Sequence, residues 1–141
     1  MEKQSFHYLQ YAVHMMIYKQ LFAGLKDTGL SIGQPKVLDY LRDHDGAVQK
    51  DIAKGCFVEP ASLSGLLDGM EKKGLLRRVA NESSRRSVNV FLTSLGWEQV
   101  KRVEQVFGEI EKAALQGFSA QECEQIAGFQ QRIYENLEAL L

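Results

Sequence analysis

The sequence is poor in cysteine and contains no long hydrophobic run. Its two cysteines, Cys56 and Cys123, lie far apart in a chain of 141 residues and form no C-x-x-C pair. This usage argues against a disulfide framework and predicts free thiols in a reducing compartment. No stretch reaches the about 18 consecutive apolar residues of a membrane-spanning helix, and the first residues lack the apolar block of a signal peptide. We therefore expect a cytoplasmic protein without a membrane partner.

The motifs of common enzymes and cofactor sites are also missing. The chain has no P-loop, no G-x-G-x-x-G, no G-x-S-x-G and no H-E-x-x-H. His7 and His14 share a predicted helical face, but their spacing along a helix separates them by roughly 10 Å. One zinc ion with bonds of about 2 Å cannot take both. We expect no enzyme activity, no cofactor and no metal site.

Charge is nearly balanced over the whole chain but is unevenly distributed along it. The net charge is −1. Residues 72–102 hold eight basic groups and two glutamates, a local charge of +6, whereas residues 103–141 hold two basic groups and seven glutamates, a local charge of −5. Such segregation predicts one surface that attracts phosphate groups, with chance clustering as the alternative.

Hydrophobic periodicity predicts a mostly α-helical chain with one small β-hairpin. Thr93 is expected to cap the helix that follows it, and the segments 31–34 and 119–122 have the pattern of capping boxes. The expected helices cover about 2–25, 31 to the turn at 43–46, 49–55, 60–73, 93–116 and the segment from 119 onward. The expected strands cover 75–79 and 87–92, on either side of a polar tip at 80–84.

The helix predicted for 60–73 has an unusual outward face. Its apolar side chains recur at helical spacing and predict a buried face made of Leu63, Leu66, Leu67 and Met70. The opposite face is made of Ala61, Ser64, Gly65 and Asp68, and it is flanked by Ser62 and Gly69. Small side chains let a helix backbone approach a surface closely, and serine hydroxyls can bond base edges or phosphates. This pattern predicts a helix that reads a groove of DNA.

The hairpin that follows carries adjacent arginines, Arg85 and Arg86, just after its tip. A guanidinium on a projecting hairpin suits the narrow minor groove, where the negative potential of DNA is strong. Arg77 in the first strand is a further DNA-binding candidate on the same hairpin. The alternative is a charged hairpin that only prevents edge-to-edge aggregation.

From residue 31 to the C-terminus the chain resembles the MarR family of winged-helix transcriptional regulators. The resemblance lies in six segments, whose combination is more specific than any one of them. They are 34–41 (QPKVLDYL), 49–53 (QKDIA), 58–64 (VEPASLS), 67–78 (LDGMEKKGLLRR), 84–87 (SRRS) and 92–96 (LTSLG). The chain departs from the family pattern at Ser84, where an aspartate is usual, and at Gly65 and Gly69, where arginine is frequent. Fewer arginines on the reading helix predict a weaker salt dependence of binding.

The resemblance implies a homodimer and a fold of two parts within one continuous domain. Residues 1–30 and 93–141 would form a helical dimerisation region, and residues 31–92 would form a winged helix-turn-helix lobe. In that arrangement the helix at 60–73 enters the major groove of double-stranded DNA, Arg86 enters the minor groove and Arg85 lies near the backbone. Two-fold symmetry implies a pseudo-palindromic operator with half-sites about 34 Å apart. The family also implies a repressor that a small ligand releases from DNA.

The first helix carries a polar and aromatic stripe that the family resemblance connects with ligand binding. Members often sense small phenolic or aromatic acids, and the stripe of His7, Tyr11, His14 and Tyr18 could line such a pocket. The alternative is a dimer interface or the edge of the core. Two other functions stay open: a winged-helix module that binds protein rather than DNA, and a regulator that senses oxidants through Cys56.

Overall fold

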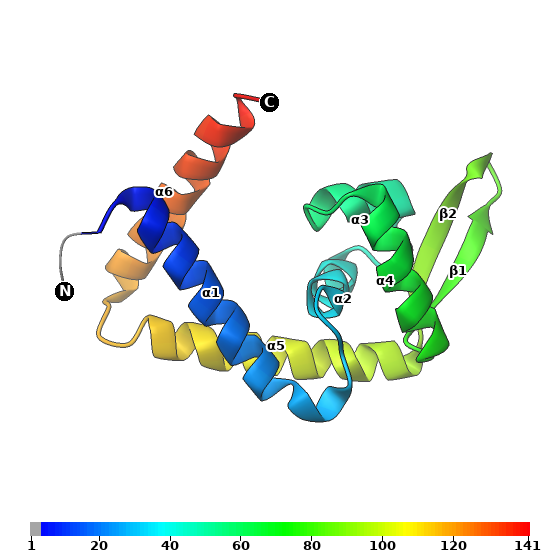
Figure 1. Cartoon of the computed structure of the whole chain (residues 1–141), viewed down its shortest axis with the longest axis horizontal. Helices are drawn as coiled ribbons and strands as arrows, with labels where there is room; N and C mark the ends of the chain where they lie inside the picture. Colours follow the sequence, from blue (N-terminus) through cyan, green and yellow to red (C-terminus); the bar gives the residue numbers. More distant parts are fainter. Residues whose placement is uncertain (1–3) are drawn as a thin grey trace. The chain divides into compact units, whose positions relative to one another are not determined.

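The computed structural model describes residues 4–141, which form six α-helices, a short 3-10 helix and one hairpin (Figure 1). The elements are α1 (Phe6–Gly24), η1 (Lys26–Thr28), α2 (Gln34–Asp43), α3 (Gln49–Gly55), α4 (Pro60–Lys72), β1 (Leu76–Asn81), β2 (Ser84–Leu92), α5 (Ser94–Ala114) and α6 (Ala120–Glu138). This mostly α-helical order with one hairpin agrees with the predicted fold class. Glu2 and Lys3, where the first helix is predicted to begin, lie outside the described residues.

The chain divides into two compact units, Met1–Gly108 and Glu109–Leu141, with the boundary inside α5. In the second unit α6 begins with a complete capping box. Ser119 Oγ accepts the backbone N–H of Glu122 at 3.0 Å, and the Glu122 carboxylate accepts the N–H of Ser119 at 3.4 Å. Two of the free donors at the helix start are thereby satisfied, as the sequence predicts.

The core of the first unit forms from the apolar faces of α2, α3, α4, the hairpin and the first part of α5. Its fully buried side chains include Val37, Leu38, Leu41, Ile52, Leu63, Leu67, Met70, Val90 and Val103. Leu66, predicted to belong to the buried face of α4, is only half-buried. It lies at the edge of that face, where its methyl groups cover the backbone of Gly33.

The start of α2 differs from the predicted capping box. Gly33 is the N-cap residue with a left-handed φ of 91°, and no side chain caps the helix. Gln34 forms only half of the box, because its Oε1 accepts the N–H of Ser31 at 3.1 Å while the Ser31 side chain bonds no helix N–H. The buried Gln34 Oε1 also accepts a hydrogen bond from Lys73 Nζ at 2.8 Å, and Nζ donates to the carbonyl of Gly29 at 2.7 Å. Lys73 therefore ties the end of α4 to the segment before α2.

The two strands pair antiparallel, from Leu76 opposite Leu92 at the base to Asn81 opposite Ser84 near the tip. Val48, the residue before α3, forms an isolated antiparallel bridge to β2. The hairpin is therefore hydrogen-bonded to the start of the helix-turn-helix as well as to itself, which fixes where it stands relative to α3.

The hairpin tip is shorter than the predicted 80–84 segment. The Asn81 side chain closes it, since Oδ1 accepts the N–H of Ser83 at 2.8 Å and Nδ2 donates to Asn89 Oδ1 at 2.9 Å. Such a side-chain turn lets the strands pair almost to the end of the hairpin. As a consequence, Arg85 and Arg86 lie within β2 rather than in a loop beyond it.

The helices α1 and α6 leave much apolar surface uncovered. In α1, Leu21 is buried, but Phe6 is 58% exposed and Tyr11 65% exposed. In α6, Phe129 is 55% exposed and Leu137 57% exposed. Each helix thus presents an apolar stripe that its own unit does not bury. Within residues 4–141 we find no helix with the length and hydrophobicity needed to cross a membrane.

Candidate nucleic-acid interface

The exposed face of α4 is built from short side chains. Pro60 occupies the first turn of the helix, where its missing N–H is harmless, and Gly74 follows the C-terminus with a φ of 75°. Between them Ala61, Ser62 and Gly65 are exposed and Ser64 is half-buried, as the helical periodicity predicts. A Cβ added at Gly65 would meet no atom within 4 Å. The middle of this face can therefore approach another surface at backbone distance.

The turn that joins α3 to α4 is tight and holds one strained residue. The N–H of Val58 donates to the carbonyl of Ala53 at 3.0 Å, which closes the turn. Phe57 has a φ of 57°, a left-handed value that non-glycine residues rarely adopt, and its side chain is 76% exposed. The turn directs the chain from α3 into Pro60, so that the N-terminus of α4 projects from the lobe.

Cys56 in the same turn is a buried thiol. It is 5% exposed, and its S–H lies 3.6 Å from the carbonyl of Lys36. Burial raises the pKa of the Cys56 thiol to about 11. Because the thiolate is the form that reacts with oxidants, little reactive sulfur is present at neutral pH. These properties argue against redox sensing through Cys56.

The hairpin arginines fall into three different environments. The guanidinium of Arg77 lies 5.0 Å from the ring centroid of Phe91, in a cation–π contact. Arg78 forms ion pairs with carboxylates of α4. Arg85 and Arg86 are exposed on β2. The arginines predicted from the sequence to bind DNA are those that form no ion pair with a carboxylate within residues 4–141, namely Arg77, Arg85 and Arg86.

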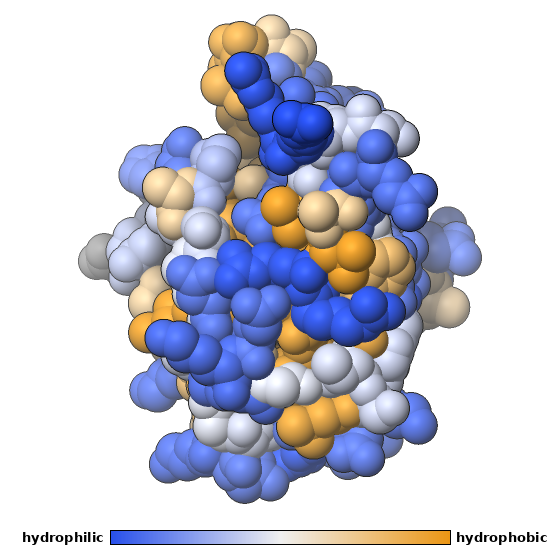
Figure 2. All heavy atoms as spheres, turned by 90° about the vertical axis from the view of Figure 1, so that its right-hand side faces the viewer, coloured by the Kyte–Doolittle hydropathy of each residue, from blue (hydrophilic) through white to orange (hydrophobic). Residues whose placement is uncertain are grey.

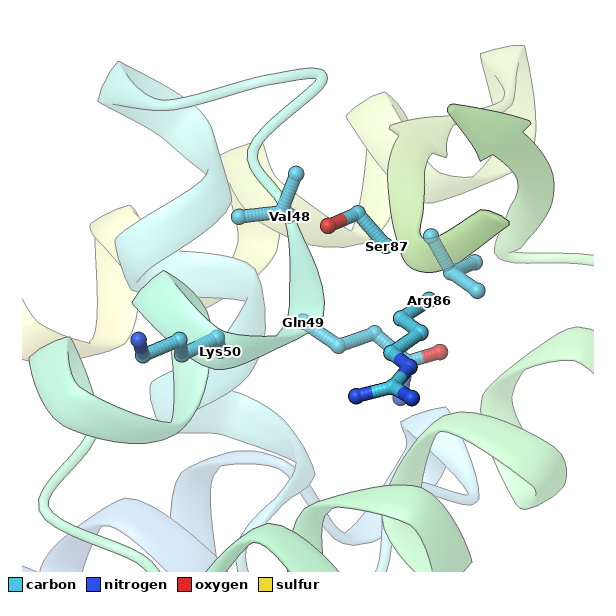
Figure 3. Close-up of a pocket in the computed structure, with 6 residues that line it drawn as sticks. Val48, Gln49, Lys50, Arg86 and Ser87 are labelled. Atoms are coloured by element: carbon cyan, nitrogen blue, oxygen red, sulfur yellow. The ribbon is translucent and has the colours of Figure 1, made fainter. Parts of the chain in front are cut away.

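A cavity of about 240 Å³ separates the start of α3 from the hairpin (Figure 3). It is lined by Val48, Gln49, Lys50, Arg86, Ser87 and Val88. In Figure 3 the Gln49 side chain extends toward Arg86, whereas Lys50 points away along α3. Among the described residues the lining includes two cations and no carboxylate, so that the cavity favours an anionic group. Gln49 and Lys50 were not predicted from the sequence, because their approach to β2 depends on the bridge that Val48 forms.

The face that carries the hairpin is mostly hydrophilic, with small hydrophobic patches between polar side chains (Figure 2). It combines the small-residue face of α4 with guanidinium groups of β2, which suits a polar and negatively charged partner such as a nucleic acid.

The polar and aromatic stripe of α1 is present but largely open. The rings of His14 and Tyr18 lie 4.6 Å apart between centroids, and those of Tyr18 and Phe22 lie 6.1 Å apart. Tyr11 and His7, about one and two turns before His14, are exposed. Within residues 4–141 no three histidine, cysteine, aspartate or glutamate side chains lie close enough together to hold a metal ion.

Comparison with curated proteins identifies relatives among transcriptional regulators. The family model described as "MarR family" matches residues 30–88. The chain is 30% identical over 99 residues to the HTH-type transcriptional repressor Mb2911 of Mycobacterium bovis, covering 70% of this chain and 71% of the relative. It is 33% identical over 86 residues to the HTH-type transcriptional regulator PecS of Dickeya dadantii, covering 61% of this chain and 52% of PecS. The match thus spans about half the length of PecS.

Solved structures show the same architecture over nearly the whole chain. The S. aureus MepR–DNA complex superposes with a TM-score of 0.87 at 26% identity, covering 96% of this chain and 99% of MepR. The apo form of E. coli MarR superposes with a TM-score of 0.78 over 94% of this chain and 98% of MarR, at an identity of 22% that supports the fold alone. The predicted winged-helix fold and the family resemblance are confirmed, and the chain belongs to the MarR family.

Proposed function

We propose that the protein is a homodimeric, sequence-specific DNA-binding regulator of transcription that acts as a repressor. The observation that carries this proposal is one compact lobe in which the exposed small-residue face of α4 stands beside a hairpin with three exposed arginines. MepR, which has the same fold, has been crystallised with DNA. The protein would work in the cytoplasm, as a binding protein rather than an enzyme.

The helix α4 is the element that reads bases. Its exposed N-terminal half fits the major groove, where Ala61, Ser62, Ser64 and Gly65 would lie against base edges and the flanking phosphates. Serine hydroxyls can donate to or accept from either base or backbone, and the absence of a side chain at Gly65 allows close approach. The turn at Val58 sets the angle at which this half of the helix projects.

The hairpin and the start of α3 supply the contacts to the DNA backbone and the minor groove. Arg86 would enter the minor groove and Arg85 would lie near the phosphates, since both are exposed on β2. Arg77 would contribute a more distant positive charge. The cavity beside Arg86 adds Gln49 to this interface, because a phosphate next to the minor groove would find the Gln49 amide and the Arg86 guanidinium there.

Dimerisation would cover the apolar stripes of α1 and α6. Side chains such as Phe6, Tyr11, Phe129 and Leu137 are more than half exposed in the single chain. Burying large apolar side chains contributes about 2 kcal/mol each, and a second copy would supply the matching surface. Two-fold symmetry would then place two α4 helices about 34 Å apart for a pseudo-palindromic site.

DNA binding is tested by selecting bound fragments from random duplex DNA and by gel shifts on the selected site. We expect a palindromic consensus, and about a tenfold weaker affinity for Arg86→Ala and Ser64→Ala. Lys54→Gln is the matched control, since Lys54 is exposed on α3 but does not line the cavity beside Arg86. Sedimentation should give a mass near twice 15.9 kDa. A monomer, or no binding to any duplex at low ionic strength, would contradict the proposal.

Release by a small ligand is the second part of the proposal. The stripe of His7, Tyr11, His14 and Tyr18 offers rings and hydrogen-bonding groups for an aromatic acid, and the ring contact between His14 and Tyr18 already orders part of it. Titration of the protein–DNA complex with a hydroxybenzoate should release DNA, and His14→Ala should raise the concentration required. Equal release from wild type and variant would show that the stripe is not the binding site.

A further inference from the structure

Of the two exposed carboxylates on the outward side of α4, Asp68 and Glu71, Asp68 lies nearer the N-terminal half of the helix. It follows Ser64 by one helical turn and therefore lies on the same face. Its side chain is 54% exposed. A negative charge there would face the phosphates of a duplex that receives α4, and juxtaposed like charges weaken association. In the structure, Asp68 forms an ion pair with Arg78, a cation of β1.

Arg78 of β1 reaches across to α4, which runs beside the strand (Figure 1). Its Nη2 donates to Asp68 Oδ1 and lies 3.2 Å from Glu71 Oε1. The backbone N–H of Arg78 also donates to Glu71 Oε2 at 3.1 Å. The Arg78 side chain is only 22% exposed. Three hydrogen bonds thus connect one residue of the hairpin to two carboxylates of the helix.

Arg77 and Arg78 are adjacent in β1 but have different partners. Arg77 precedes Arg78 in the strand, so that its side chain lies on the opposite face of the hairpin, over Phe91. The hydrogen bonds from Arg78 lower the pKa of Glu71, while Glu71 and Asp68 raise the pKa of Arg78. Both shifts favour the charged forms, the Glu71 carboxylate and the Arg78 guanidinium.

We propose that Arg78 is a positioning residue, which holds the hairpin against the reading helix and neutralises Asp68 in front of the DNA without itself binding DNA. The inference rests on the proposed DNA-binding function. It assigns different roles to adjacent arginines: Arg77 adds charge to the interface, and Arg78 sets the geometry between α4 and the hairpin. It also makes Asp68 a residue whose removal strengthens binding.

The binding test compares affinities and their salt dependence for wild type, Asp68→Asn, Arg78→Gln and the double variant. We expect Arg78→Gln to weaken binding about tenfold with an unchanged salt slope, and Asp68→Asn to strengthen it several-fold. The double variant should regain most of the affinity that Arg78→Gln loses. Arg42→Gln is the control, because Arg42 also bridges carboxylates, Asp39 and Glu104, but on α2 and α5. If the salt slope falls by about 0.9 in Arg78→Gln, and Asp68→Asn rescues nothing, Arg78 binds a phosphate and the proposal is wrong.

The positioning role is tested separately in the free protein by amide hydrogen exchange. Arg78→Gln should accelerate exchange in the hairpin, 76–92, relative to the core of α4, and Arg42→Gln should not. Equal exchange in both variants would overturn the positioning role whatever the DNA result. If wild type binds no duplex, the proposed function fails while this readout still decides whether Arg78 holds the hairpin.

Discussion

Replacing Gly96 with alanine should be among the most destabilising single changes in the first unit. Gly96 lies in the first turn of α5, and a Cβ there would stand 2.0 Å from the carbonyl oxygen of Leu75. The carbonyl cannot swing away easily, because it accepts the N–H of Thr93 at 3.1 Å. Thr93 Oγ1 in turn donates to the carbonyl of Gly74 at 2.6 Å and accepts the N–H of Gly96 at 3.0 Å. The helix and the 74–75 turn must therefore separate by about 1 Å, with a cost near 3 kcal/mol.

Urea denaturation followed by circular dichroism measures this loss of unfolding free energy directly. In a separate thermal melt, the melting temperature of Gly96→Ala should fall by roughly 10 °C. Gly108→Ala is the matched control in the same helix, since a Cβ at Gly108 meets no atom within 4 Å. Alanine there should stabilise the chain by up to about 1 kcal/mol. If Gly96→Ala unfolds within 1 kcal/mol of wild type, a figure roughly at the lower end of overpacking costs, then the close approach of α5 to Leu75 does not fix the helix.

Three further changes test the core, the thiol and the second unit. Leu67 is fully buried, so that Leu67→Ala should lower the free energy of unfolding by about 3 kcal/mol in the same urea assay. Because burial raises the pKa of Cys56 from 9.0 to about 11, the folded state favours the protonated thiol. Stability should fall as the pH rises from 9 to 11, and less steeply in Cys56→Ala; parallel pH curves would contradict this. Ser119→Ala removes the acceptor for the N–H of Glu122 and should destabilise α6 by about 1 kcal/mol in a thermal melt.

Helix positions could be predicted well from the sequence because local signals define them. The expected 49–55 and 60–73 segments correspond to α3 and to α4, which ends at Lys72, and Thr93 caps α5 as predicted. The errors occurred where a residue's partner is distant or its backbone unusual. The left-handed Gly33 replaced the predicted cap at Ser31, and the side chain of Asn81 shortened the hairpin tip.

The candidate site was only partly predictable, for the same physical reason. Periodicity alone gives the exposed face of α4, because all its members belong to one helix. The four hairpin arginines look equivalent in the sequence, yet Arg78 alone among them is paired with Asp68 and Glu71 in the part of the chain that the structure describes. Ion pairs between a strand and a preceding helix depend on tertiary placement, which no local spacing specifies. The approach of Gln49 to Arg86 depends on tertiary placement in the same way.

The ammonium group of Lys73 links the reading helix mechanically to the chain that leaves α1. Its two acceptors are the carbonyl of Gly29, which follows η1, and the side-chain amide oxygen of Gln34, the first residue of α2. Hydrogen bonds tolerate only a few tenths of an ångström of stretch. A displacement of the 26–33 segment by more than that must either break both bonds or pull on the end of α4, so that Lys73 couples the position of this segment to that of the helix.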